Sequence, residues 1–500
     1  MFLFQAISHY MDYFEESPPL ALATVSSHAR ECGERHKKGV IGCNIISDEY
    51  GPRRVAYAVS SDVVRLGRAR WWIERQRDDP LLISVTFDCT KSLKDIKTWE
   101  TVSQRLSQGK IEQMLGLNIR RAESLLPFAA LLRQSERIAL TDCDLTTLDP
   151  LKEIKRLRKV EFSSCRGAFA MDPLLTCPNR TCVVVAHCDG VTSVEVLGGL
   201  RNLKEIAFKD CTITNVDFLK GCALLKSVDV SHCPNLTSLS GLSGLEKLGA
   251  VNASESGIWS IGDPTGCLAL ESLDASDCKS LTSLSGLHEL EKLKTLNANG
   301  SGIESVEHLA GCVALESVSV ERCGKLTSLT GLSGLRKLIT LNAYLSGIQS
   351  IEDLTGCVAL ESLDLSDCWS LKSLAGLAGL EKLKTVHVSA TSIQSLIELT
   401  GCVALESIEV GYCKNLTSLA ELNGLEKLKV VDAWNSGIQS LGDLTRCVAL
   451  EAVNVSYCEG LASLDGLNGL QNLRAVYAIG TSAPRGTILK GCPALENLIL

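Results

Sequence analysis

The chain has 500 residues and a net charge of −8, and 45% of its residues are hydrophobic although only 5% are aromatic. This balance excludes a disordered chain, since disorder goes with low hydrophobicity, and no run of residues approaches the roughly 18 apolar positions of a membrane-spanning helix. Because few rings are available, we expect a soluble protein whose core consists of thin layers of small aliphatic side chains.

Residues 1–127 differ from the rest of the chain in composition and show no internal repeat. They begin without the basic segment of a signal peptide. They carry a net charge of +2, whereas residues 128–500 carry −10. Residues 100–116 suit a helix, and the segment LLISVTFDC (81–89) suits a strand that faintly resembles later segments. We predict a small α+β region over 1–127 that acts as a cap or an adaptor-binding module, with room for a degenerate leading repeat.

An internal repeat of 45 residues runs through the remainder of the chain. Each period divides into a 23-residue unit, such as 356–378, and a 22-residue unit, such as 379–400. Both units follow the frame L-x-x-L-x-L-x-x-[C/S/T]-x-x-[L/I], in which two leucines of L-x-L point to one side of a strand. Cysteines recur with the period in two series: 177, 222, 267, 312, 357, 402, 447 and 492, and 143, 188, 233, 278, 323, 368, 413 and 458.

This frame resembles the leucine-rich repeat, and the resemblance covers residues 128–500 in about 16 units. The 23-residue unit is similar to the cysteine-containing variety and the 22-residue unit to the compact variety. Their alternation more loosely resembles leucine-rich repeat proteins of parasitic protozoa. The resemblance implies an α/β solenoid, a curved horseshoe with a parallel β-sheet on its concave face and loops or 3₁₀ turns on its convex face. Stacked units of this kind share one continuous core.

The repeated cysteines invite a disulfide or zinc interpretation, and their spacing argues against both. The 45-residue step places equivalent thiols two strands apart, about 9.6 Å, because the intervening units carry residues such as Ser346 or Thr391 there. Bridged Cα atoms lie within about 7 Å, and the frame contains no C-x-x-C motif. We expect small buried residues whose thiols donate weakly to loop carbonyls. So many free thiols favour a reducing compartment, and we predict a cytoplasmic protein, with the nucleus as the alternative.

Two groups of side chains stand out at the positions that face the concave side. One is an acidic series, which comprises Asp229, Asp274, Asp364 and Glu409, with Asp432 in a shorter unit. The other is an aromatic group in the C-terminal half, which comprises Tyr344, His387, Tyr412, Trp434, Tyr457 and Tyr477. Large amphipathic rings on a polar surface are typical of binding hot spots. We predict that these residues bind a partner protein; the alternatives are rings that merely cover neighbouring strands, or a surface for folding or assembly.

Charge and the chain's last residues bear on the kind of partner. An acidic solenoid repels phosphate, so we expect no nucleic acid and favour a basic or polar protein surface. We also expect no membrane partner.

The sequence ends in ALENLIL, with Leu495, Leu498 and Leu500 on core positions. Because an uncovered edge strand invites pairing, self-association through this strand is an alternative to a truncated or weakly capped end.

The sequence contains none of the motifs G-x-x-x-x-G-K-[ST], H-E-x-x-H or G-x-S-x-G that mark common catalytic sites. A repeated surface offers breadth rather than a closed pocket. We therefore predict a non-enzymatic protein-interaction scaffold that needs no cofactor or metal and binds its partner on the concave sheet. Two alternatives are a substrate-recognition adaptor of a ubiquitin ligase, and a regulator or inhibitor of an enzyme such as a phosphatase or ribonuclease.

Overall fold

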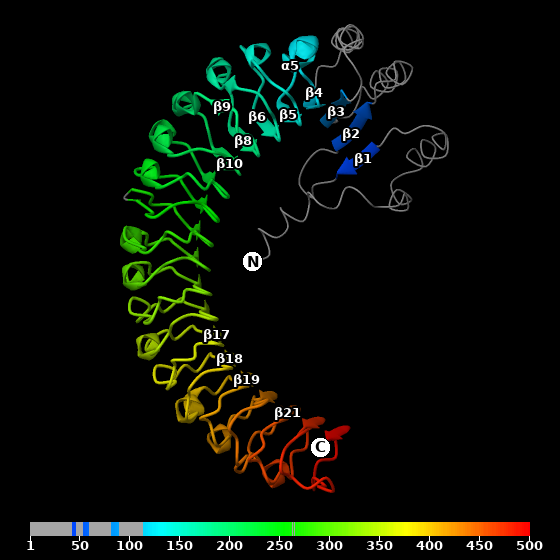
Figure 1. Ribbon diagram of the computed structural model, residues 1–500, viewed down its shortest axis with the longest axis vertical. Coiled ribbons are helices and arrows are strands. Elements are labelled where there is room, and N and C mark those ends of the chain that lie inside the picture. The colour runs from blue at the N-terminus through cyan, green and yellow to red at the C-terminus, as the bar shows by residue number, and fades with distance from the viewer. Residues whose placement is uncertain (1–42, 47–53, 60–81, 90–113, 263, 265) are drawn as a thin grey trace, which may run out of the picture.

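A computed structural model describes residues 43–46, 54–59, 82–89, 114–262, 264 and 266–500. Within them the chain winds into a curved solenoid, and each coil contributes one strand to a common sheet (Figure 1). The sheet lies on the concave side of the arc, and most of the short helical turns lie on the convex side. The horseshoe predicted from the repeat is therefore confirmed.

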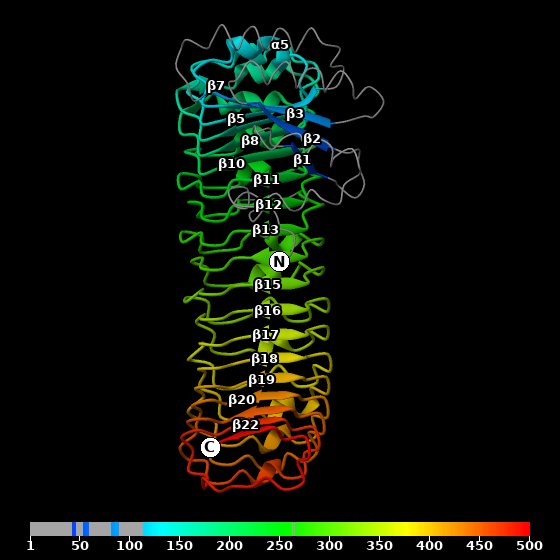
Figure 2. The ribbon, with the colours of Figure 1, turned by 90° about the vertical axis from the view of Figure 1, so that its right-hand side faces the viewer.

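The described strands include 21 that form this sheet. β1 (Cys43–Ile46) pairs antiparallel with β2 (Arg54–Val59), and the strand pairings that follow are parallel. Figure 2 looks onto the concave side and shows the later strands stacked in chain order. The other strands of the sheet are β3 (Leu82–Asp88), β4 (Met114–Arg120), β5 (Arg137–Thr141), β6 (Lys159–Ser163), β8 (Cys182–Ala186), β10 (Glu205–Lys209), β11 (Ser227–Asp229), β12 (Ala250–Asn252), β13 (Ser272–Asp274), β14 (Thr295–Asn297), β15 (Ser317–Ser319), β16 (Thr340–Asn342), β17 (Ser362–Asp364), β18 (Thr385–His387), β19 (Ser407–Glu409), β20 (Val430–Asp432), β21 (Ala452–Asn454), β22 (Ala475–Tyr477) and β23 (Asn497–Ile499).

The remaining elements lie in the turns between these strands. β7 (Phe169–Ala170) and β9 (Val191–Thr192) form a separate two-stranded sheet. α5 (Ala129–Leu132) is a single helical turn. The 3₁₀ helices are η3 (Leu126–Phe128), η4 (Asp149–Leu151), η5 (Asp172–Thr176), η6 (Val194–Gly199), η7 (Asp217–Gly221), η8 (Ser240–Leu242), η9 (Leu287–Glu289), η10 (Glu307–Leu309), η11 (Glu352–Leu354), η12 (Ile397–Gly401), η13 (Ala420–Leu422) and η14 (Asp465–Leu467).

The parallel sheet begins upstream of residue 128. β2, β3, β4 and β5 pair in consecutive order, so the strand predicted over 81–89 is confirmed as β3. The helix predicted over 100–116 lies outside the described residues as far as residue 113, and residues 114–116 belong to β4 instead. Leu117 and Ile119 of β4 are both buried, which is the alternation of a strand rather than the period of a helix.

Alternation of buried and exposed side chains places the core behind the sheet. In β17, Leu363 is buried whereas Ser362 and Asp364 on either side of it are half-buried. Leu365, which follows the strand, is also buried. One coil cannot cover its own leucines, so the apolar side of each coil packs against the coils before and after it. The same alternation leaves Asp364 on the concave surface, as predicted.

The cysteines of both series lie in or against this core, and their thiols bond to backbone carbonyls. Cys368 donates to the carbonyl of Ala343 in the preceding coil at 3.3 Å, and Cys357 donates to Leu332 at 3.2 Å. The hydroxyl of Ser346 donates to the same Ala343 carbonyl at 2.6 Å. No disulfide joins the described cysteines. Burial raises the pKa of the Cys368 thiol, so this thiol stays protonated as a small, weakly polar core residue.

Candidate partner-binding surface on the concave sheet

Three rows of side chains cross the concave side where the strands end. The first row holds the last residue of each short strand, and the second row lies two positions further along the chain. The third row holds the residue after that, where each coil turns away from the sheet. Strand pairing aligns seven predicted residues on the first row: Asp229, Asp274, Asp364, His387, Glu409, Asp432 and Tyr477. Tyr344 and Trp434 lie on the second row, and Tyr412 and Tyr457 lie on the third.

The aspartates of the first row hydrogen-bond to their own turns. Oδ1 of Asp364 accepts the backbone N–H of Ser366 at 2.9 Å. Asp229 and Asp274 accept the equivalent bond, and Asn342 accepts it in the coil before Asp364. Side chains of Asp and Asn commonly close a turn in this way. These carboxylates therefore have a structural role that the sequence did not reveal.

Replacing Asp364 by asparagine should leave stability within about 0.5 kcal/mol of the wild type, since Asn342 makes the same bond one coil earlier. Replacing Asp364 by alanine should lower the free energy of unfolding by about 1 kcal/mol, because the turn loses its hydrogen bond. Chemical denaturation of the full chain measures both changes. Equal losses for the two variants would show that the charge of Asp364, rather than its hydrogen bond, stabilises the turn.

Three aromatic rings from three successive coils pack together, and we call them the aromatic cluster: Tyr412, Trp434 and Tyr457. The Trp434 ring lies between the other two, with its centroid 4.7 Å from Tyr412 and 5.8 Å from Tyr457. The interplanar angles are 84° and 88°, which is the favourable edge-to-face arrangement. Tyr412 is 45% exposed and Tyr457 is 47% exposed, so the cluster presents a partly exposed apolar surface.

The turn conformation explains how two tyrosines come to flank one tryptophan. Third-row residues repeatedly adopt a left-handed backbone, with φ of 59° at Tyr412, 54° at Asn435 and 62° at Tyr457. The left-handed residue is held by the neighbouring coil, since the N–H of Tyr412 donates to the carbonyl of Trp434 at 2.8 Å. Because Tyr412 and Tyr457 are on the third row and Trp434 is on the second, their side chains leave the backbone at different points and interlock.

The other predicted aromatic residues stay outside the cluster. Tyr344 lies three coils before Tyr412, and the adjacent Asp367 carboxylate raises the pKa of its hydroxyl. Tyr477 is 39% exposed and lies one coil after Tyr457, but no ring pair joins these two among the described aromatic contacts. His387 points its Nε2 toward Glu409, 3.7 Å from Oε1. Among the described ring contacts, the structure therefore brings together three members of the predicted aromatic group, Tyr412, Trp434 and Tyr457.

Two carboxylates lie next to the aromatic cluster. Glu409 ends β19 and Asp432 ends β20, so both are on the first row beside it. Oδ1 of Asp432 accepts the backbone N–H of Trp434 at 2.9 Å, and both of its oxygens lie near Nδ2 of Asn454. Glu409 is 46% exposed, and within the described part of the chain its side chain has one ion pair, the 3.7 Å contact with His387. Glu409 is therefore the carboxylate with the greater freedom to meet a partner.

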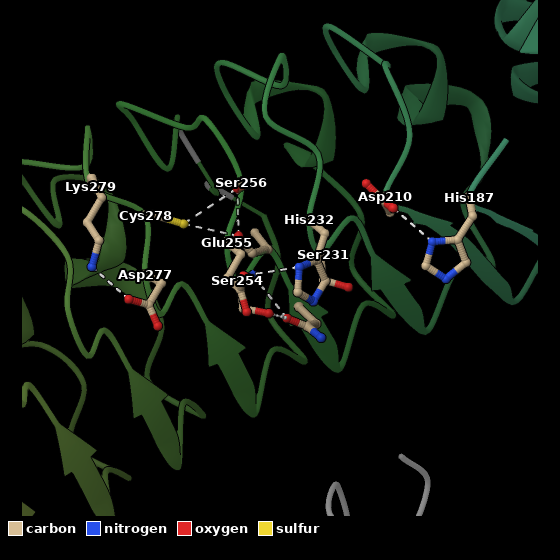
Figure 3. A network of polar contacts seen from close by, with 12 residues as sticks. His187, Asp210, Ser231, His232, Ser254, Glu255, Ser256, Asp277, Cys278 and Lys279 are labelled. Atoms are coloured by element: carbon tan, nitrogen blue, oxygen red, sulfur yellow. Dashed lines mark hydrogen bonds and ion pairs between the residues drawn. The ribbon is translucent and has the colours of Figure 1, made fainter. Parts of the chain in front are cut away.

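In the N-terminal half, the third row carries charged pairs that sequence reasoning missed. They are seen in Figure 3: His187 with Asp210 at 2.8 Å, His232 with Glu255 at 3.2 Å, and Asp277 with Lys279 at 2.7 Å. Most link adjacent coils, and all are exposed, so each contributes little to stability. The sequence does contain a signal that locates these charged residues, because third-row residues immediately precede the repeated Cys, Ser or Thr of every coil.

Other kinds of site find no support in the described part of the chain. There, no group of three or more His, Cys, Asp or Glu side chains is arranged to hold a metal ion. Nor does that part contain a helix long and apolar enough to cross a membrane.

A curved stack of coils with a parallel sheet inside and 3₁₀ turns outside defines the leucine-rich repeat class, and the protein has this fold. No protein-family model matches its sequence, and no curated protein matches it either.

Several solved structures are similar. Drosophila Toll in complex with Spatzle is 13% identical with a TM-score of 0.57, over 90% of this chain and 63% of that one. An internalin of Listeria monocytogenes is 15% identical with a TM-score of 0.50, over 72% of this chain and 94% of that one. TLR13 in complex with ssRNA13 is 15% identical with a TM-score of 0.50, over 86% and 61%. The chain thus spans less than two thirds of the Toll and TLR13 chains, and at these identities the likeness concerns the fold alone.

Proposed function

We propose that the protein is a non-catalytic interaction scaffold that binds a partner protein on its concave sheet through the aromatic cluster. The supporting observation is the packing of Tyr412, Trp434 and Tyr457 on a surface that is otherwise polar. Aromatic residues of this kind carry much of the energy in protein interfaces. Because the rings already hold each other in place, their ordering costs little on binding.

The surrounding charge suggests the chemistry of the partner. Glu409 and Asp432 lie beside the aromatic cluster, and residues 128–500 carry a net charge of −10. A basic or polar protein surface complements this field, whereas the phosphates of a nucleic acid are repelled. The TLR13 structure is a complex with RNA, so RNA binding is the outcome that would most directly contradict this choice of partner.

Three narrower statements remain predictions. The many free thiols support a reducing compartment, and we place the protein in the cytoplasm, with the nucleus as the alternative. Capture of a ligase core subunit would favour the ubiquitin-ligase adaptor, and capture of a phosphatase or ribonuclease would favour the regulator. Self-association through β23 would appear as a concentration-dependent dimer in sedimentation.

Replacing both Tyr412 and Trp434 by alanine should weaken partner binding by about 2 kcal/mol or more, because the centre of the surface is lost. Trp369 offers a matched control, since it is 66% exposed but follows Cys368 in the turn that leaves the sheet. Partners captured from cell extract by the full-length wild type and by Trp369→Ala, and lost from the double variant, would identify cluster-dependent binding. Undiminished capture by a folded double variant would refute the proposal.

A further inference from the structure

Five consecutive coils carry cysteine at one and the same position: Cys143, Cys165, Cys188, Cys211 and Cys233. Strand pairing aligns Ser163 with Ala186 and Ala186 with Lys209, each two residues before a cysteine. Adjacent members are thus one strand apart, about 4.8 Å, within the Cα separation that a disulfide spans. The prediction that spacing excludes disulfides therefore applies only beyond Cys233, where Ser and Thr alternate with Cys. In these first coils the shorter units carry Cys165 and Cys211 instead.

A cleft of about 210 Å³ reaches two of these thiols. Cys188 and Cys211, which come from adjacent coils, line the cleft together with Phe208, and all three side chains are buried. Thr192 and Thr214 also line it and are exposed. The cleft therefore leads from solvent to two cysteine residues of adjacent coils.

A departure from the repeat accounts for the cleft. Three residues after Cys233 and Cys278 the chain places Leu236 and Leu281, and both are fully buried. The residue at this position after Cys188 is Val191, which is shorter and only half-buried. The core beside Cys188 is consequently filled less completely than in the regular coils.

The two thiols differ in their surroundings. Sγ of Cys188 accepts the backbone N–H of Cys165 at 3.3 Å. Hydrogen bonds from the Cys165 thiol and, to a smaller extent, from that N–H lower the pKa of Cys188 in spite of its burial. Both thiols donate to the carbonyl two residues earlier, Cys188 to Ala186 at 3.1 Å and Cys211 to Lys209 at 3.2 Å. Burial raises the pKa of Cys211 to about 11. The thiolate is the reactive form of cysteine, so Cys188 is the nucleophile of the pair.

We propose that Cys188 and Cys211 form a redox-sensitive pair that a small hydroperoxide oxidises to a disulfide. The Cys188 thiolate attacks one peroxide oxygen, the O–O bond breaks, and the other oxygen leaves as water or alcohol after taking up a proton. The resulting sulfenic acid is attacked by the Cys211 sulfur, so that the S–S bond forms and the S–O bond breaks. Hydroxide leaves with the thiol proton as water, and the two electrons lost by the thiols have reduced the peroxide.

The test treats the folded, full-length protein with hydrogen peroxide, then blocks the remaining thiols in acid denaturant and maps linked peptides by mass spectrometry. A disulfide between Cys188 and Cys211 that dithiothreitol reverses is the expected product. Cys278 and Cys323 are internal controls, because their neighbours Ser256 and Ser301 offer no second thiol. A Cys165–Cys188 disulfide in its place, or oxidation of Cys278 as fast as that of Cys188, would overturn the assignment.

Two variants test separately the role of Cys211 in disulfide formation and the role of the cleft in admitting peroxide to Cys188. Cys211→Ser introduces the residue that Ser256 supplies in a regular coil, so the fold should persist while Cys188 stops at the sulfenic acid, detected with dimedone. Val191→Leu restores the residue of the regular coils and keeps every thiol. Filling the cleft should slow oxidation of Cys188 about tenfold, because susceptibility follows exposure. An unchanged oxidation rate in Val191→Leu would show that the cleft is not the route of the peroxide.

Discussion

Replacing Arg180 by leucine is expected to raise the free energy of unfolding by about 2 kcal/mol. Arg180 is 1% exposed and stands three residues after Cys177, where Leu225 stands after Cys222 in the next period. One guanidinium nitrogen, Nη2, donates to the carbonyl of Leu174. Among the described residues, Nε and Nη1 have no hydrogen-bond partner. A buried charge with unpaired donors is costly, and leucine removes that cost.

The pH dependence of this gain has a definite sign. Burial lowers the pKa of Arg180 to about 10. The guanidinium is therefore still charged at neutral pH, and lowering its pKa from 12.5 to about 10 corresponds to about 3 kcal/mol. Because the pKa is lower in the folded than in the unfolded state, the destabilisation is complete below about pH 10 and is relieved as the pH rises further. The advantage of the Arg180→Leu variant should shrink above that pH.

Urea denaturation of the wild type and the variant, at neutral pH and above pH 10, measures both effects. The difference between the two proteins isolates Arg180 from the lysines and tyrosines that titrate in the same range. Arg201→Leu is the matched control, since Arg201 is exposed and should change stability little. A lower stability of Arg180→Leu would contradict the expectation and would mean that the guanidinium makes a favourable interaction in this core.

Replacing Leu363 by alanine is expected to lower the free energy of unfolding by about 3 kcal/mol. Leu363 is 1% exposed in β17 and pairs with Leu341 on one side and Val386 on the other. Truncation of this side chain leaves a cavity, and the two neighbouring coils would have to move to fill it. Leu498 is the matched control, because it holds the equivalent place in β23 but is half-buried and, among the described strands, pairs only with Val476.

Denaturant unfolding of the two alanine variants gives the comparison. In a solenoid each coil contributes its own stability and its two interfaces, so Leu363→Ala should lower the main transition while Leu498→Ala affects it little. Similar losses for both variants would mean that the sheet unfolds as one unit without regard to local burial.

Most of the fold was predictable from local pattern. The frame around Leu363 and Leu365 specifies which side of a strand is apolar, and its recurrence specifies that coils stack in parallel. The surface position of Asp364 followed from the same alternation. The helix expected over 100–116 was wrong in its last residues, since the alternation of Leu117 and Ile119 extends the strand pattern into that region.

The candidate sites were only partly predictable. All three residues of the aromatic cluster were predicted. The packing of their rings against one another was not, because it depends on the left-handed turn at Tyr412 and Tyr457. The role of Asp364 in closing a turn was missed because Asp and Asn appear at this position simply as polar residues. The sequence shows Cys165 and Cys211, but an interpretation based on the 45-residue step overlooked that they lie only one coil away from the neighbouring cysteines.

By itself, the sequence determined the repeat, the side of each strand that faces the core, and the residues that reach the concave surface. These properties depend on neighbours a few positions apart along the chain. Only the tertiary structure decided which rings touch, where Val191 leaves a cleft beside two thiols, and that Arg180 lies buried with unpaired donors. Those outcomes depend on the packing of side chains from coils about 22 residues apart, whose relative placement local periodicity does not encode.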